Sequence, residues 1–155
     1  MRRLEADEWK VFREVRLAAL RDAPYAFGST YEAELGAGEN SWRSRLEARA
    51  RFVAQSGREV VGTVAGGSSG LSGIAALTAL WVAPAARGRG VGEALVMAVL
   101  AWARDSDYEQ VVLWVVEGNS PAERLYDRIG FKRTGAAQPV RPGDDRIEYE
   151  MSRTL

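Results

Sequence analysis

The sequence of 155 residues contains no cysteine and no histidine. The chain therefore has no disulfide, no thiolate nucleophile and no Ser-His-Asp triad, and it lacks the two residue types that zinc sites usually need. We expect no metal site. Any proton transfer must use carboxylates, tyrosine, lysine, a substrate group or water.

The sequence also lacks an excess of charge and a long apolar run. Its 21 basic and 21 acidic residues cancel, so no field of the whole protein would attract nucleic acid. Nowhere do about 18 apolar residues follow one another, and the charged start from Arg2 onward differs from a signal peptide. These features predict a cytoplasmic protein without nucleic-acid or membrane partners. The length predicts a single domain, 1–155.

Apolar spacing and turn residues predict helices and strands in a mixed order. Helices are expected at 5–21, 31–35, 41–50, 91–104 and 119–130, and strands at 51–57, 58–67, 74–84, 110–118, 131–135 and 144–154. Ser29 or Thr30 is expected to cap the second helix, and Ser41 the third. The unbroken apolar strand at 110–118 should be covered on both faces. This order predicts a mixed α/β sheet with helices on its faces.

The segment "RGRGVG", residues 87–92, joins a predicted strand to a predicted helix. Its glycines, Gly88, Gly90 and Gly92, allow positive φ and let main-chain N–H groups approach a ligand. The first turn of the helix adds unpaired N–H donors, and Arg87 and Arg89 add positive charge, so the segment predicts a phosphate or pyrophosphate site. A glycine-rich turn with solvated arginines is the alternative.

Two common phosphate motifs are absent from this segment. Glu93 stands where the dinucleotide fingerprint has glycine, and the Gly-Lys-Ser/Thr of Walker A is missing. A nicotinamide or ATP site is therefore disfavoured.

Two stretches resemble the cofactor motifs of the GNAT superfamily of N-acetyltransferases. In "LWVAPAARGRGVGEALV", Arg87, Gly90 and Gly92 match the acetyl-CoA signature. In "NSPAERLYDRIGFKRTG", the second motif is matched by Asn119, Ala122, Leu125, Tyr126, Gly130 and Phe131. The likeness is strong from Leu80 to Gly135. It implies a GNAT-type mixed, mostly antiparallel central sheet with helices on both faces and a splay between the two central strands.

The resemblance implies that acetyl-CoA is the cosubstrate and that its acetyl group passes directly to a primary amine of a small molecule or peptide. The pantetheine arm would add to a strand edge, and a main-chain N–H near Val82 would polarise the thioester oxygen. The cofactor-binding residues implied in this way are Leu80, Val82, Ala83, Arg87, Gly88, Arg89, Gly90, Val91, Gly92, Asn119, Ala122 and Tyr126.

Tyr126 is the candidate general acid, because a phenol keeps its proton at neutral pH and can donate it to the leaving sulfur. A purely structural role for Tyr126 in the core is the alternative. The general base is left open among Glu32, Glu34 and Glu117, and an amine of lowered pKa would need none. Trp42, Trp81 and Trp114 are expected in the core or in a pocket wall.

Two other functions stay open at this point. A GNAT-like protein could bind acyl-CoA as a sensor or scaffold without turnover, and the anion turn could serve a nucleotide-binding regulator. The acceptor amine is not identified by the sequence. By resemblance, a homodimer formed through the sheets is one option for the oligomeric state.

Overall fold

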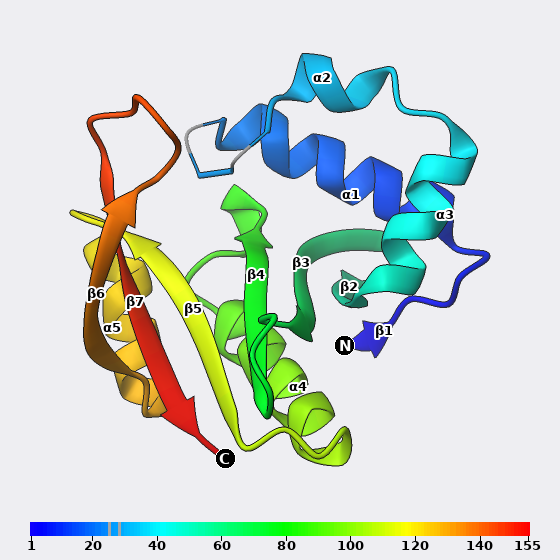
Figure 1. Ribbon diagram of the computed structural model, residues 1–155. Helices are drawn as coiled ribbons and strands as arrows, with labels where there is room; N and C mark the ends of the chain where they lie inside the picture. The colour runs from blue at the N-terminus through cyan, green and yellow to red at the C-terminus, as the bar shows by residue number, and fades with distance from the viewer. Residues whose placement is uncertain (25, 28) are drawn as a thin grey trace.

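A seven-stranded sheet runs through the computed structural model, which describes residues 1–24, 26–27 and 29–155 (Figure 1). The strand order is β1-β2-β3-β4-β5-β7-β6. Every neighbouring pair is antiparallel except β4 and β5. The strands are β1 (Arg2–Arg3), β2 (Ala50–Ser56), β3 (Glu59–Ser68), β4 (Ile74–Val82), β5 (Gln110–Val116), β6 (Lys132–Pro139) and β7 (Ile147–Thr154).

Helices cover both faces of this sheet. They are α1 (Trp9–Asp22), α2 (Tyr31–Leu35), α3 (Glu39–Ala48), α4 (Val91–Asp105) and α5 (Ser120–Ile129), with a 3₁₀ turn at Pro84–Ala86. The mixed α/β architecture and the mostly antiparallel sheet confirm the fold class expected from the sequence. Across the described residues, none of the helices combines the length and the apolar character that a membrane span requires.

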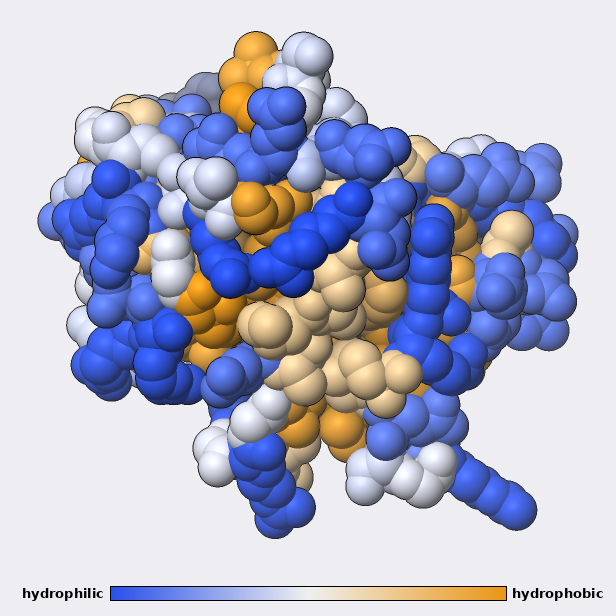
Figure 2. Space-filling view, turned by 90° about the horizontal axis from the view of Figure 1, so that it is seen from below, coloured by the Kyte–Doolittle hydropathy of each residue, from blue (hydrophilic) through white to orange (hydrophobic). Residues whose placement is uncertain are grey.

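Two apolar clusters lie on opposite faces of the sheet. Val53 and Ala54 are neighbours in β2, so their side chains point to opposite faces, and each belongs to a different cluster. One cluster holds the buried face of α4 and Tyr126 of α5, while the other holds α1 and the fully buried Trp42 of α3. Seen from below, apolar residues gather in the middle of the surface with hydrophilic ones around them (Figure 2).

The two central strands are paired over a short length. β4 and β5 pair in parallel from Ile74↔Gln110 to Ala76↔Val112, and Figure 1 draws them apart beyond that point. The register of β4 on β3 shifts within this region, and Ala79 has a φ of 56°. A non-glycine residue at positive φ is uncommon, and here it marks a β-bulge that redirects β4. The second half of β4 therefore has one edge without a strand partner.

The start of the chain was predicted as helix from residue 5, but α1 begins at Trp9. Residues 2–4 instead extend the sheet, since Arg2 and Arg3 pair with β2 and the Leu4 N–H donates to the Arg51 carbonyl. This two-residue strand was not predicted. Thr30 caps α2 by accepting a hydrogen bond from the Ala33 N–H, as one of the two expected capping residues.

Several other boundaries differ from the predicted ones. The third helix begins at Glu39 with Gly38 as its N-cap, so Ser41 is not the cap. β6 extends to Pro139 because 137–139 pair with β7, where a loop was expected. β4 ends at Val82, before Pro84. In β5, buried residues alternate with half-buried ones, so one face is fully covered and the other only in part, where cover on both faces was expected.

Gly66 provides a test of the packing between β3 and α4. A Cβ built at Gly66 would lie 2.8 Å from the Trp102 ring and 3.1 Å from Val99. We expect Gly66→Ala to lower the free energy of unfolding by about 1–3 kcal/mol, the usual cost of overpacking. Urea denaturation measures this change. Gly36→Ala is the matched control, because nothing lies within 4 Å of its Cβ position; equal stability of both variants would contradict this packing.

Candidate functional site

A pocket of about 660 Å³ opens where β4 ends and where α4 and α5 begin. Nine of the predicted cofactor-binding residues line it: Leu80, Val82, Arg87, Gly88, Gly90, Val91, Gly92, Asn119 and Ala122. Side chains that the sequence did not single out also take part, among them Phe27 and Arg128. The glycine-arginine segment and the start of α5 therefore meet around one cavity.

The loop before α4 has the backbone that an anion site requires. Gly88 and Gly90 have φ values of 76° and 80°, a left-handed conformation that disfavours side chains. The first intrahelical bond of α4 runs from the Ala94 N–H to the Gly90 carbonyl, so the N–H groups of 91–93 have no acceptor within the helix. These donors and the positive end of the helix dipole face a pocket, which favours a phosphate there.

The third glycine of the loop serves packing. A Cβ at Gly92 would lie 3.3 Å from the Leu125 side chain of α5 and 3.8 Å from Val82 of β4. Gly92 thus lets the start of α4 lie close to α5 and to the end of β4, which keeps the pocket walls together.

Arg87 is held at the rim by contacts that the sequence did not reveal. Its Nη2 lies 2.7 Å from the Asp22 Oδ2, and its Nε donates to the Val82 carbonyl at 3.0 Å. The same Asp22 oxygen accepts a hydrogen bond of 2.9 Å from the Trp81 Nε1. Asp22 is exposed at the end of α1 and nothing in the local sequence marks it. Arg89 is exposed and is not among the residues that line the pocket, so its part in cofactor binding stays a prediction.

The edge of β4 that has no strand partner borders the pocket, where Leu80 and Val82 line it. Ala83 was expected to bind the cofactor through the strand edge. Its N–H instead donates to the Val61 carbonyl at 2.8 Å, so this amide faces β3 and is not available to a ligand. Successive residues of a strand point their N–H groups to opposite sides. The Val82 N–H therefore points away from β3, beside its carbonyl that binds Arg87.

A smaller cavity of about 120 Å³ lies between β4 and β5 and adjoins the pocket. Leu80, Asn119 and Ala122 line both spaces. Trp114 of β5 lines the smaller cavity, whereas Trp81 is buried in the core beside α1 and reaches the larger pocket. The two tryptophans thus have different roles, which the sequence could not assign.

Tyr126 lies in the wall of the smaller cavity. Its side chain is buried, and its ring packs edge-on against Phe131 with centroids 5.9 Å apart. The hydroxyl has no hydrogen-bond partner among the described residues, and burial raises the pKa of Tyr126 to about 12. Asn119 accepts a hydrogen bond from the Ala122 N–H at 3.4 Å and caps α5 between the two cavities. Because its pKa is raised to about 12, Tyr126 holds its proton at neutral pH.

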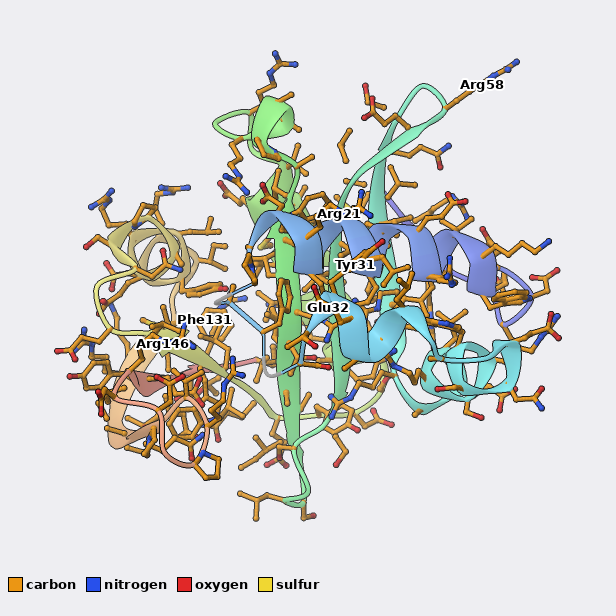
Figure 3. All side chains as sticks on the ribbon, turned by 90° about the horizontal axis from the view of Figure 1, so that it is seen from above. Arg21, Tyr31, Glu32, Arg58, Phe131 and Arg146 are labelled. Carbon is orange, nitrogen blue, oxygen red and sulfur yellow. The ribbon has the colours of Figure 1, made fainter. Side chains whose placement is uncertain are left out.

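The three candidate bases do not line either cavity. Glu117 is exposed and accepts a hydrogen bond of 3.1 Å from the Tyr149 hydroxyl. Glu32 is exposed on α2, as Figure 3 shows. Glu34 is buried and binds both Arg16 and Arg45; burial raises its pKa, but these two arginines outweigh it and hold the pKa below its ordinary value. Glu34 therefore has a structural role.

A hydrogen bond between two distant segments lies at the wall of the site. Arg141, in the loop between β6 and β7, donates to the Phe27 carbonyl at 3.1 Å. Phe27 lines both cavities, so this bond fixes the wall formed by the segment after α1. The described residues include no group of three or more acidic side chains that could hold a metal ion.

Several known proteins are similar to this chain. N-acetyltransferase family 8 member 2 from Rattus norvegicus is 40% identical over 99 residues, which are 60% of this chain and 43% of that protein. A mycothiol acetyltransferase from Thermobispora bispora is 48% identical over 52 residues, 34% of this chain and 18% of that protein. The chain thus spans less than half the length of these curated relatives.

Solved structures share the whole fold. The structure of yncA from Salmonella typhimurium, which contains its cofactor acetyl-CoA, has a TM-score of 0.80 and 20% identity, and covers 99% of this chain and 92% of its own. A GCN5-related N-acetyltransferase from Kribbella flavida has a TM-score of 0.73 and 24% identity, with 99% and 96% covered.

A match to the acetyltransferase (GNAT) family spans residues 9–131. These residues include the sheet from β2 to β5, the glycine loop, Asn119 and Tyr126. Since the match covers most of the chain, and since the fold and the cavity walls agree with it, this chain belongs to the GNAT acetyltransferase family.

Proposed function

We propose that the chain is an N-acetyltransferase that moves an acetyl group from acetyl-CoA directly to a primary amine of a small molecule or peptide. The observation that carries this proposal is that the two cavities adjoin and share lining residues. An anion site at the start of α4 leads along the free edge of β4 to a cavity walled by Tyr126. This arrangement suits a long cosubstrate with a diphosphate at one end and a reactive thioester at the other.

The residues present fit such a cosubstrate along its length. The N–H groups at 91–93 and the loop with Gly88 and Gly90 would bind the diphosphate. The β4 edge at Leu80 and Val82 would bind the amides of the pantetheine arm as an added strand. When bound, acetyl-CoA supplies the activated acetyl carbonyl. The names of the relatives and the acetyl-CoA in the yncA structure support this assignment.

Several groups of the chain would act during transfer. The Val82 N–H donates to the carbonyl oxygen as negative charge develops there. Asn119 and the β4 edge orient the donor beside the amine, and orientation alone supplies several kcal/mol. As the new C–N bond forms and the C–S bond breaks, Tyr126 donates its proton to the sulfur. The amine proton leaves to water or, through water, to Glu117.

Gly90 tests the anion site. Its Cβ position is open, so Gly90→Glu would place a negative side chain at the loop and force it into a left-handed backbone. We expect acetyl-CoA affinity to fall at least about tenfold, because one charge-assisted hydrogen bond is worth about that factor. Calorimetric titration measures this affinity.

Gly57→Glu is the matched control for Gly90→Glu. Gly57 also has a positive φ and open space at its Cβ position, but it lies in the turn between β2 and β3. The Gly57→Glu variant should bind acetyl-CoA like the wild type. An unchanged affinity in Gly90→Glu would overturn the assignment of the loop to the diphosphate.

Tyr126 tests turnover independently of binding. Tyr126→Phe keeps the packing on Phe131 and removes the acid, so kcat should fall about a hundredfold, within the usual range for general acids, while acetyl-CoA affinity stays the same. Thiol release measures kcat. Tyr108→Phe, which removes a hydroxyl beside Trp102, is the control. Full turnover in Tyr126→Phe would show that Tyr126 is structural, and a wild type that binds acetyl-CoA without turnover would favour a sensor.

A further inference from the structure

A third cavity, of about 390 Å³, is lined by α1, α3, β2 and the bulge of β4. Four arginines stand in its wall: Arg16, Arg45, Arg49 and Arg51. Glu34 is the carboxylate that pairs with this group, and it binds Arg16 and Arg45. Among the described residues, Arg49 and Arg51 form no ion pair with a carboxylate. The wall therefore carries more positive charge than the protein neutralises.

Arg51 is the most unusual member of this group. Its residue is 7% exposed, and its polar contact is a long hydrogen bond of 3.4 Å from Nη1 to the Thr63 hydroxyl. Its guanidinium lies over the Phe12 ring, 4.5 Å from the centroid. A buried charge is costly unless an opposite charge lies near it. A bound anion would provide that charge.

The neighbouring arginines add to this cost. Burial first, and then the charges of Arg16, Arg45 and Arg49, lower the pKa of Arg51 to about 9, while the charge of Glu34 acts in the opposite direction. The guanidinium still carries its charge at neutral pH. Because an anion among these groups would be attracted by all of them and partly shielded from water, its binding would be stronger than at an exposed arginine.

The arginine cavity adjoins the site of acetyl transfer. It shares Ala26 and Phe27 with the large pocket, and it shares Thr78 and Ala79 with the cavity that Tyr126 lines. A small molecule with its anionic group among the arginines could therefore extend past the β4 bulge toward Tyr126. That is where the acceptor amine would meet the acetyl group.

We propose that the acceptor is a small amine that also carries an anionic group, a carboxylate or a phosphoryl group, and that Arg49 and Arg51 bind this group. The proposal rests on the proposed acetyltransferase function and names the class of its acceptor. A guanidinium binds either anion through paired N–H donors, so both belong to the same chemistry. The positive charge of the cavity disfavours polyamines and other acceptors that carry a net positive charge.

Matched pairs of acceptors test this class. The pairs are L-amino acids against their carboxamides, and 2-aminoethylphosphonate against ethanolamine, with spermidine as a cationic amine. Thiol release from acetyl-CoA is the measurement. We expect the anionic member of at least one pair to have a kcat/KM at least about tenfold higher than its neutral partner, as for one charge-assisted bond. The better pair shows whether the anion is a carboxylate or a phosphoryl group.

Arginine variants link this preference to the cavity. Arg49 is exposed and forms no ion pair, so Arg49→Gln should fold normally and raise the KM of the anionic acceptor at least about tenfold, with little change for acetyl-CoA. Arg51→Lys keeps a buried charge but loses the fork of donors. Arg58→Gln is the control, since Arg58 lies at the tip of the β2–β3 turn and points away from the molecule (Figure 3).

The outcomes separate this proposal from the proposed function. Equal rates for neutral and anionic amines, or an unchanged KM in Arg49→Gln, would overturn the acceptor class while the acetyltransferase function stands. If no amine releases thiol, calorimetric titration of 2-aminoethylphosphonate and of L-glutamate into the CoA-bound protein tests the cavity directly. Binding that is lost in Arg49→Gln supports the anion site without turnover, and no binding of either probe contradicts it.

Discussion

The short pairing between β4 and β5 is the constraint on which the rest of the site depends. A parallel pair that continued to Val82 would use the N–H groups of β4 in the sheet and would close the cavity beside Tyr126. The bulge at Ala79 prevents this by turning β4 while its other edge stays on β3. The sheet thus stays continuous at one end of β4 and β5 and leaves backbone groups unpaired at the other end. The proposed binding of acetyl-CoA uses backbone donors at that end.

Contacts from distant parts of the chain fix the walls around this opening. Asp22 at the end of α1 binds both Trp81 and Arg87, so it joins α1, β4 and the glycine loop. Arg141 joins the β6–β7 loop to Phe27 in a similar way. Exposed ion pairs contribute little to stability, but these bonds hold side chains at the cavity rim in one arrangement. These bonds therefore matter more for the position of the side chains than for the free energy of unfolding.

The glycine loop and the second motif were predictable from sequence because their geometry is local. The loop has a left-handed backbone at positions 88 and 90, which favours glycine there. Asn119 caps a helix that begins at the next residue. The arginine cavity was not predictable in this way, because its members come from α1, α3 and β2. The same limit explains why Ala83 was assigned a ligand role: a strand's side-to-side alternation is fixed by its partner, which the sequence does not show.

A chain without histidine would have to manage both protons of the proposed acyl transfer with other groups, and the described side chains provide for the two protons differently. Tyr126 keeps its proton because burial disfavours its anion, which suits it to the proposed role of general acid. None of the predicted carboxylates lines the adjoining cavities, so in the proposed reaction the amine would arrive neutral or release its proton to water. Positive charge near an ammonium disfavours its protonated form. If the proposed acceptor leaves part of the arginine charge uncompensated, the cavity that selects it would also favour the free amine that attacks the thioester.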